Sequence, residues 1–436
     1  MNQRDLPHVR LEQVLFEMRR VIVGQDRVLE RLMVAVLADG HVLLEGVPGL
    51  GKTLALETMA RILGGAFARI QFTADLIPSD IIGTRIYRPS QEAFDIEPGP
   101  VFANIVLADE INRAPAKVQS ALLEVMAERH VTIGGRTLQA PSPFLVVATQ
   151  NPIESEGVYA LPEAQRDRFL MRVPVDYPTP AEEAEIVRRM ENGVPAVSRL
   201  LDATDVVALQ AAARGVYVDP VVADYGVRIV LATREPAAHG VTDIAGQLEY
   251  GASPRASIGL VRAGRAMALL RGRDYVLPQD IYDVAYDILN HRLVLSYRAL
   301  AEGITTDEIV VKVLSTVRAP RLATVGPDGR TAWQLAPGVT PATQLPVQAP
   351  QPARQAPEPA AAQWAPPVLA QPYPAQQAAQ QPPVQAQPPV QAQPVLVPPP
   401  QAPHQQPVAT YVTPSRHSEA ATAAPDRDGT DGSEAR

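Results

Sequence analysis

Apolar residues recur at helical spacing in two segments near the start of the chain. The positions are Leu11, Val14, Leu15, Met18 and Ile22 in the first segment, and Leu29, Leu32, Met33, Val36 and Leu37 in the second. Steps of three and four residues place these side chains on one face of an α-helix. Gly40 follows the second segment and is a typical helix end. The pattern therefore predicts two amphipathic helices.

Further along, short apolar runs alternate with helical patterns. Five such runs occupy residues 41–45, 68–72, 105–108, 145–149 and 169–175. They are too short for buried helices, so we interpret them as buried strands. Alternating strands and helices are typical of a parallel sheet covered by helices. The fold class that we expect is α/β.

Two segments interrupt this alternation as predicted β-hairpins. Residues 131–138 alternate around Gly134-Gly135, and residues 85–96 alternate around Pro89-Ser90. From about Pro178 the strand signal stops. Helix starts with proline at the first position then follow at Thr179-Pro180, Asp219-Pro220, Ser253-Pro254 and Leu277-Pro278. We therefore expect an α/β domain over 1–177 and a helical lid domain over 178–320.

The proline content changes near Pro320. Residues 321–436 hold 24 of the 44 prolines, and residues 382–394 contain a near-repeat of PPVQAQ. Such a segment buries too little apolar surface to offset chain entropy. We expect a disordered Pro/Gln/Ala-rich tail over 321–436, extended and partly polyproline II. It is either a solvated tail without a specific role or a docking tail for a partner.

Composition and charge exclude several classes of protein. The chain has 436 residues, a formal net charge of −8 and no cysteine. Cys-ligated metals, disulfides and thiol catalysis are therefore excluded. The mild acidity gives no support for nucleic-acid binding by charge, and no apolar run is long enough to span a membrane. We expect a cytoplasmic protein with no nucleic-acid partner and no integral membrane segment.

A phosphate-binding loop follows the first predicted strand. The motif G-x-x-x-x-G-K-[ST] is matched by Gly46, Val47, Pro48, Gly49, Leu50, Gly51, Lys52 and Thr53, and a helical run follows. Glycines let backbone N–H groups surround phosphate oxygens, and a helix N-terminus favours an anion. Lys52 would neutralise the β- and γ-phosphates, and Thr53 would offer a hydroxyl to Mg²⁺.

The lysine of this motif is one of only three in the chain. Lys52, Lys117 and Lys312 stand against 36 arginines. The planar fork of arginine cannot replace a compact ammonium beside phosphates, which explains why Lys52 is retained. A chance match to the motif is therefore a weak alternative.

Two carboxylates end the third predicted strand. Asp109 and Glu110 follow the apolar run 105–108 and lie 57 residues after Lys52. The first carboxylate can hold the Mg²⁺ shell, and the second can activate the attacking water. Without the phosphate-binding loop, the pair would be an ordinary strand end.

A third polar group, Asn151, ends the predicted strand 145–149. It is placed to hold the γ-phosphate or the attacking water, and the alternative is a turn residue before Pro152. A guanine-reading Asn-Lys-x-Asp motif is absent, which favours ATP over GTP.

Four segments together resemble the MoxR-type branch of the AAA+ ATPases. They are HVLLEGVPGLGKT, IVLADEINRAPAKVQSALLEVMAE, VVATQNP and LPEAQRDRFLM, and the resemblance covers about residues 10–315. It implies an AAA+ P-loop core with strand order 5-1-4-3-2, a helical lid and two hairpin insertions. It also implies ATP-dependent, chaperone-like remodelling of partner proteins, often ones with a von Willebrand factor A domain. Asn151 then has the sensor 1 role.

The resemblance further implies a ring, usually a hexamer, with each site completed by an arginine of the neighbouring subunit. Arg168 of the Asp-Arg-Phe segment is the match to this arginine finger. A leucine commonly precedes that segment in the family, whereas this chain has Arg166, which is the second candidate. A cation on the γ-phosphate stabilises the developing charge. The alternative for either arginine is a surface ion pair.

Arg255 matches the sensor 2 position of the family. Ser253 as N-cap and Pro254 as first helical residue place it in the first turn, where a cation opposes the helix dipole. The phosphates of the nucleotide would remove that conflict, and the alternative is an exposed arginine.

Two further segments have weaker signals. Val23 and Gly24 lie in an apolar turn that, by the resemblance, lines the adenine pocket. Lys117, after the carboxylate pair, has either a subunit-interface role or a place on a solvated helix face.

Three alternatives to a ring-forming remodelling ATPase remain from the sequence. They are the ATPase subunit of a chelatase-like metal-insertion complex, a DNA motor and a non-hydrolysing scaffold acting through the tail. The acidic chain disfavours the DNA motor, since residues 130–138 offer only His130 and Arg136 as potential cations. The intact set of Lys52, Asp109 and Glu110 disfavours the scaffold.

Overall fold

The fold is seen in a computed structural model, which describes residues 6–151, 158–191, 193–321, 324–325 and 331–332. The predicted tail falls almost wholly outside these residues. Within 321–436, only Arg321 and the two-residue strands β12 (Thr324–Val325) and β13 (Thr331–Ala332) are described, and the two strands pair antiparallel. These strands were not expected from the composition.

A five-stranded parallel sheet forms the α/β part. Its strands are β1 (Val42–Glu45), β2 (Phe67–Gln71), β5 (Ile105–Asp109), β8 (Leu145–Gln150) and β9 (Met171–Pro174). They pair in the order β9-β1-β8-β5-β2, which confirms the expected order 5-1-4-3-2. All five strands lie within two residues of the apolar runs that predict them.

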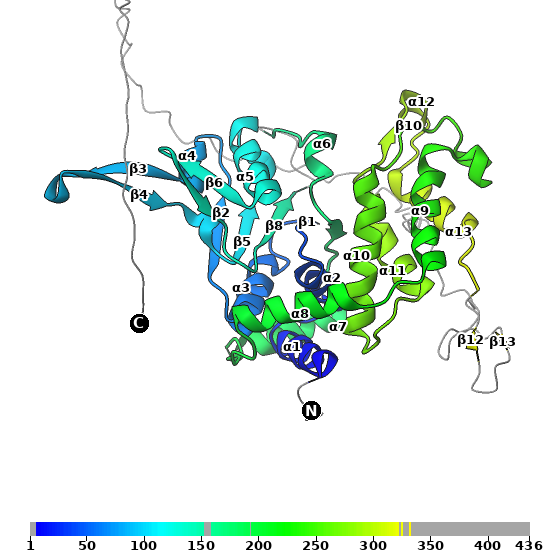
Figure 1. The fold of residues 1–436 in the computed structure, drawn as a ribbon, viewed down its shortest axis with the longest axis horizontal. Coiled ribbons are helices and arrows are strands. Elements are labelled where there is room, and N and C mark those ends of the chain that lie inside the picture. The colour runs from blue at the N-terminus through cyan, green and yellow to red at the C-terminus, as the bar shows by residue number, and fades with distance from the viewer. Residues whose placement is uncertain (1–5, 152–157, 192, 322–323, 326–330, 333–436) are drawn as a thin grey trace, which may run out of the picture. The chain divides into compact units, whose positions relative to one another are not determined.

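Successive side chains of each strand face opposite sides of the sheet, and each side has its own layer of helices. Val42 and Leu44 pack with α1 (Pro7–Val21), α2 (Asp26–Leu37) and α3 (Lys52–Leu63). Leu43 packs on the other side, with α4 (Pro78–Ile82) and α5 (Ala116–Glu128). Figure 1 shows the sheet between these layers.

Both predicted hairpins are present. Strands β3 (Gly83–Arg88) and β4 (Ala93–Pro98) pair antiparallel, as do β6 (His130–Ile133) and β7 (Arg136–Gln139). The β3–β4 hairpin extends away from the sheet in Figure 1. Its exposed Tyr87 and Phe94 face each other across the strands, with ring centroids 5.2 Å apart. The hairpin therefore presents an aromatic pair on its surface.

The residues after the sheet are mainly helical. A short helix, α6 (Glu163–Arg166), precedes β9, and the later helices are α7 (Pro180–Glu191), α8 (Ala203–Gly215), α9 (Pro220–Arg234), α10 (Pro254–Leu270), α11 (Pro278–Leu289), α12 (Tyr297–Ala301) and α13 (Thr306–Thr316). All four proline-marked helix starts are confirmed. A capping box formed by Thr179 and Glu182 begins α7.

The expectation that strands stop at Pro178 is wrong in one detail. The strands β10 (Leu248–Tyr250) and β11 (Val294–Leu295) pair antiparallel. Runs of three and two residues are too short to produce a readable alternation, so the sequence gives no signal for them. The domain boundaries at 177/178 and 320/321 remain predictions.

Helices on both sides of the first predicted boundary share one core. Helix α10 packs against α2 and α8, and α11 packs against α10 and β9. Arg31 of α2 is buried and donates to the fully buried Asp287 of α11 across 2.6 Å. The helical part is therefore joined to the sheet by apolar packing and by a buried ion pair.

Candidate functional site

The predicted phosphate-binding loop connects β1 to α3, with α3 beginning at Lys52. Gly49 and Gly51 have φ values of +88° and +74°, which glycine adopts without strain. A Cβ at either position would meet no atom within 4 Å, so these glycines serve the backbone conformation rather than a tight contact. Gly46, in contrast, lies so close to Val175 that a Cβ would come within 2.6 Å of its carbonyl oxygen. The loop thus has open space beside two glycines and the positive φ values that are common where backbone N–H groups turn toward an anion.

Lys52 folds back over the loop. Its Nζ donates to the carbonyl oxygen of Gly46 across 2.6 Å. Burial lowers the pKa of Lys52 from its ordinary value, and the nearby carboxylates of Asp109 and Glu110 oppose that shift. An incoming phosphate would replace the carbonyl as the partner of this half-buried ammonium.

Asp109 ends β5 with both carboxylate oxygens engaged. Oδ1 accepts from the Thr149 hydroxyl across 2.7 Å, and Oδ2 accepts from Arg69 Nη2 across 2.7 Å. Thr149, from the neighbouring strand β8, also accepts the backbone N–H of Glu110 across 2.8 Å. One buried hydroxyl therefore fixes both carboxylate residues.

Glu110 begins the turn after β5 in a left-handed conformation, with φ at +56°. Its Oε2 accepts from Gln71 Nε2, at the end of β2, and from Arg113 Nε, each across 2.9 Å. The predicted water-activating carboxylate is thus held by two donors in this state. Neither partner has a readable sequence signal, because each contact depends on the fold.

The carboxyl ends of three adjacent strands bring these groups together. Gly46 follows β1, Asp109 ends β5 with Glu110 directly after it, and Asn151 follows β8. Asn151 is buried, with 7% of the residue exposed, and Thr53 lies in the first turn of α3. These segments, which carry the predicted phosphate-binding loop, the two carboxylates and Asn151, therefore share one edge of the sheet. Their individual roles remain predictions.

The donors at this edge suit a hard divalent cation. Mg²⁺ prefers oxygen ligands and keeps several waters, so it needs few groups from the protein. The Thr53 hydroxyl and the Asp109 carboxylate are donors of this kind. Among the described residues, no group of three or more His, Cys, Asp or Glu side chains forms a closed metal cage.

The turn at Val23-Gly24 lies against the start of α7. Gly24 has φ at +72°, and a Cβ there would come within 2.6 Å of the carboxyl carbon of Glu182. Gln25 Nε2 also donates to the Asp176 carbonyl oxygen across 3.0 Å. The predicted adenine-lining turn is therefore tied to the connection between the sheet and α7.

Arg168 and Arg255 lie at the opposite edge of the sheet. Both line a surface pocket of about 440 Å³ together with Gly40 and His41, which precede β1. The phosphate-binding loop follows the far end of β1, and four strand residues span roughly 13 Å. The fold therefore places Arg168 and Arg255 close to each other but far from Lys52 of the same chain.

Asp167 takes the place that the sequence assigns to nucleotide phosphates beside Arg255. Its carboxylate lies 3.7 Å from Arg255 Nη1 and accepts from the Ser253 hydroxyl across 2.9 Å. Ser253 is the N-cap of α10, as predicted, and accepts the N–H of Arg255. A carboxylate thus offsets the unfavourable cation in this first turn, while the Arg255 side chain remains 54% exposed.

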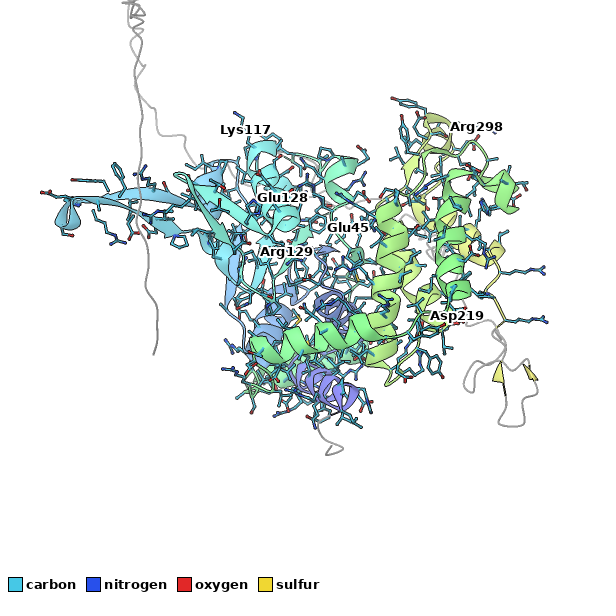
Figure 2. The ribbon with its side chains drawn as sticks, in the orientation of Figure 1. Glu45, Lys117, Glu128, Arg129, Asp219 and Arg298 are labelled. Atoms are coloured by element: carbon cyan, nitrogen blue, oxygen red, sulfur yellow. The ribbon has the colours of Figure 1, made fainter. Side chains whose placement is uncertain are left out.

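The two finger candidates have different surroundings. Arg168 is exposed, and its Nη1 donates to the Leu123 carbonyl oxygen across 2.7 Å. Arg166 Nη2 lies 3.4 Å from Glu163 on the same short helix, as in the surface ion pair considered above. Lys117 is exposed on α5 and points outward in Figure 2.

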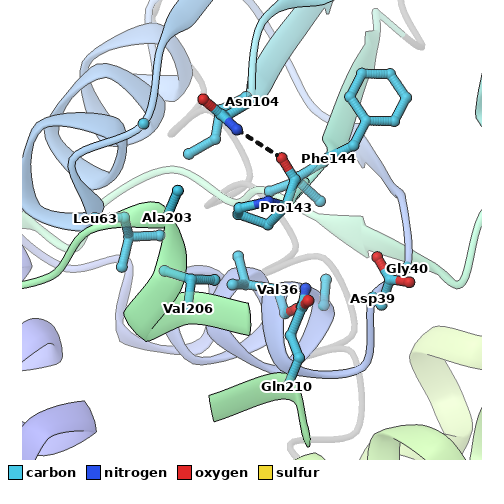
Figure 3. A pocket seen from close by; sticks show the side chains of 14 residues that line it. Val36, Asp39, Gly40, Leu63, Asn104, Pro143, Phe144, Ala203, Val206 and Gln210 are labelled. Carbon is cyan, nitrogen blue, oxygen red and sulfur yellow. Dashed lines mark hydrogen bonds between the residues drawn. The ribbon is translucent and has the colours of Figure 1, made fainter. Parts of the chain in front are cut away.

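A separate enclosed cavity is too small for a nucleotide. It lies between Val36, Leu63, Asn104, Phe144 and Val206, where Asn104 Nδ2 donates to the Pro143 carbonyl oxygen across 2.9 Å (Figure 3). Its volume of about 20 Å³ admits one water molecule. This cavity therefore offers no site for a nucleotide.

No helix among the described residues is both long and apolar enough to cross a membrane.

Two family models match parts of the chain. Residues 41–171 match the ATPase family associated with various cellular activities (AAA), and residues 241–313 match the AAA lid domain. Chaperone MoxR1 of Mycobacterium tuberculosis is 58% identical over 321 residues, which span 74% of this chain and 85% of that protein.

Two other similar proteins extend over nearly the same region. The uncharacterized protein YeaC of Bacillus subtilis is 43% identical over 73% of this chain and 97% of its own length. A crystal structure from Cytophaga hutchinsonii is 47% identical, with a TM-score of 0.69, and covers 72% of this chain and 96% of that one. These similarities leave about a quarter of this chain unmatched.

Proposed function

The chain belongs to the MoxR-type AAA+ ATPases, and on that premise we propose that it hydrolyses Mg·ATP at sites completed by neighbouring subunits of a hexameric ring. The position of Arg168 and Arg255 carries this proposal. Both lie at the sheet edge remote from their own phosphate-binding loop, yet cations of this kind act on a γ-phosphate. A neighbouring copy can present its loop to them, whereas the same chain cannot.

The carboxyl edge of the sheet supplies the groups of the binding subunit. Gly46–Thr53 surrounds the phosphates with N–H groups, Lys52 neutralises them, and Val23-Gly24 borders the adenine. Thr53 and Asp109 are the residues that would hold Mg²⁺. The ion, when bound, draws charge away from the phosphate oxygens.

Hydrolysis then follows an in-line displacement. Asn151 orients a water, Glu110 takes its proton, the oxygen bonds to the γ-phosphorus, and the bond to the ADP oxygen breaks. Arg168 and Arg255 of the neighbouring subunit stabilise the negative charge that develops. Gln71 and Arg113 both bind Glu110 Oε2 and so restrain the carboxylate that takes this proton.

Chaperone-like activity belongs to the family, and we propose a more specific client. The MoxR resemblance favours a protein with a von Willebrand factor A domain, matured by ATP-driven movement of the lid and the hairpins in the cytoplasm. The exposed Tyr87 and Phe94 offer the β3–β4 hairpin as a contact for such a client. ATPase stimulation by a purified domain of this type, rather than by a chelatase partner or by DNA, tests the proposal.

The ring itself is tested by the solution mass of the full chain carrying Glu110→Gln, measured by light scattering with and without Mg·ATP. This variant keeps the size of the side chain and removes its charge, so we expect ATP binding without turnover. Growth to a hexamer on adding ATP supports the interfacial site. A monomer with ATP bound, or a variant that still turns over, contradicts the proposal.

A further inference from the structure

Arg292, just after α11, is a buried arginine that contacts the segment carrying Arg168. Its side chain is only 3% exposed. It donates to Asp167 Oδ1 across 2.9 Å, to the carbonyl oxygen of Phe169 across 2.5 Å and to that of Leu170 across 3.1 Å. It also donates to the carbonyl oxygen of Ile288. Arg292 therefore binds residues on both sides of Arg168, the side chain of Asp167 before it and the main chain of residues 169–170 after it.

The charge of Arg292 persists despite its burial. Desolvation lowers its pKa to about 10, and the Asp167 carboxylate opposes the shift. The guanidinium is thus protonated at neutral pH and has its charged partner in Asp167. Removing one member of such a pair would leave the other charge buried, so the two residues act together.

Asp167 extends this network to the N-terminus of α10. Its two carboxylate oxygens accept from the Ser253 hydroxyl, each across 2.9 Å, while Oδ1 also accepts from Arg292. Arg255, two residues after Ser253, is 3.7 Å away and more than half exposed. Arg255 is thus the member of the network that is free to move to a phosphate, while Ser253 and Arg292 keep Asp167 in place.

We propose that Arg292 is a positioning residue that joins the Arg168 segment to the start of α10, so that Arg168 and Arg255 enter the neighbouring subunit's site as one unit. The inference rests on the proposed interfacial site. It predicts that Arg292 acts in the subunit that lends its arginines and is without effect in the subunit that binds the reacting ATP. A merely structural ion pair would show no such asymmetry.

A mixing experiment with the full chain separates the two roles. Lys52→Ala subunits cannot hold phosphate but keep their arginines, and Arg168→Ala subunits keep the phosphate-binding loop. Each variant alone is expected to be inactive. Their mixture should regain ATPase activity at interfaces where the first type lends its arginines to the second.

Arg292→Lys is then placed in one type of subunit at a time. In the Lys52→Ala partner it should lower kcat about tenfold with KM little changed, because a displaced catalytic cation costs rate. In the Arg168→Ala partner it should leave both parameters unchanged. Equal losses from either placement overturn the inference.

Arg31→Lys is the matched control. Arg31 is nearly as buried, at 7% side-chain exposure, and also binds an aspartate and a main-chain carbonyl of α11, but it does not contact residues 167–170. In the Lys52→Ala subunits it should leave the kcat of the mixture unchanged. A loss equal to that of Arg292→Lys shows that lid stability alone is responsible.

Two further outcomes are decided by the same experiment. If Arg292→Lys does not fold, Asp167→Asn replaces it, since the amide keeps the size of the carboxylate and loses its charge. If unmodified Lys52→Ala and Arg168→Ala subunits form mixed rings without recovering activity, the interfacial site itself is wrong. That outcome is distinct from a recovered mixture in which Arg292 has no effect.

Discussion

The hydroxyl of Thr149 donates to Asp109 across 2.7 Å, from a strand 40 residues further along the chain. The same oxygen accepts the Glu110 N–H, and the side chain is 1% exposed. A buried hydroxyl with two partners fixes the rotamer of one carboxylate and the backbone of the next. Thr149 therefore positions both Asp109 and Glu110.

Replacing this threonine with valine should lower ATP turnover. Thr149→Val keeps the shape and removes about 1 kcal/mol of hydrogen bonding, so we expect kcat to fall roughly fivefold. Steady-state kinetics measure the change. Thr149→Ser retains the hydroxyl and should keep most of the activity. An equal loss in the serine variant would show that packing, rather than the hydrogen bond, matters.

Replacing Gln71 should change kcat in the opposite direction, by raising it. Its amide donates to Glu110 Oε2 across 2.9 Å and so restrains the carboxylate that we propose takes a proton from water. Gln71→Ala removes about 1 kcal/mol of this restraint, which corresponds to roughly a fivefold rise in basal kcat. The comparison is made without client, at saturating ATP. An unchanged or lower kcat would show that Gln71 does not restrain Glu110.

The sequence predicts the fold well where a pattern is local. The five buried strands, both hairpins and the four proline-marked helix starts each depend on a few adjacent residues, and each is present. The strand order came from the family resemblance, because periodicity cannot reveal which strands pair. Strands β10 and β11 went unseen because three and two residues carry no alternation.

The site residues also differ in how far the sequence predicts them. Lys52, Asp109 and Glu110 are readable because their motifs are contiguous and follow predicted strands. Asp167 and Arg292 lie 125 residues apart, and the role of either emerges only from their contact. Arg255 is an intermediate case. The sequence shows a cation in need of an anion, but it does not show that a carboxylate of the same chain already stands beside it.

His41 should make stability fall in mild acid. Nδ1 accepts the Val146 N–H across 3.0 Å, and Nε2 lies 3.2 Å from the Met126 carbonyl oxygen, so the folded ring is neutral. Burial, with the nearby charge of Arg129, lowers its pKa to about 3. The unfolded chain takes up this proton near pH 6.5, so the stabilisation is complete above that pH and is lost as pH falls toward 3.

Urea unfolding between pH 7 and pH 5 measures the effect. One such histidine contributes a slope of about 1.4 kcal/mol per pH unit below pH 6.5. His41→Gln should be less stable at pH 7 and should lose about that much of the slope. Burial also lowers the pKa of His291. The His41→Gln variant therefore keeps the part of the pH slope that comes from His291. An unchanged slope would mean that His41 is protonated in the folded state.

Lys52 provides a test of why the chain keeps so few lysines. Its Nζ fits within 2.6 Å of the Gly46 carbonyl oxygen at a half-buried position, where a planar guanidinium is larger and less easily placed. Lys52→Arg should therefore weaken ATP binding about as much as Lys52→Ala, by roughly a hundredfold for a lost charge-assisted contact. Titration calorimetry with ATP measures the affinity.

Lys312→Arg, on α13, is the control and should bind ATP like the unmodified chain. The comparison distinguishes a specific requirement for lysine at position 52 from a general effect of replacing lysine with arginine. If Lys52→Arg binds ATP normally, positive charge suffices, and the scarcity of lysine has no bearing on this site.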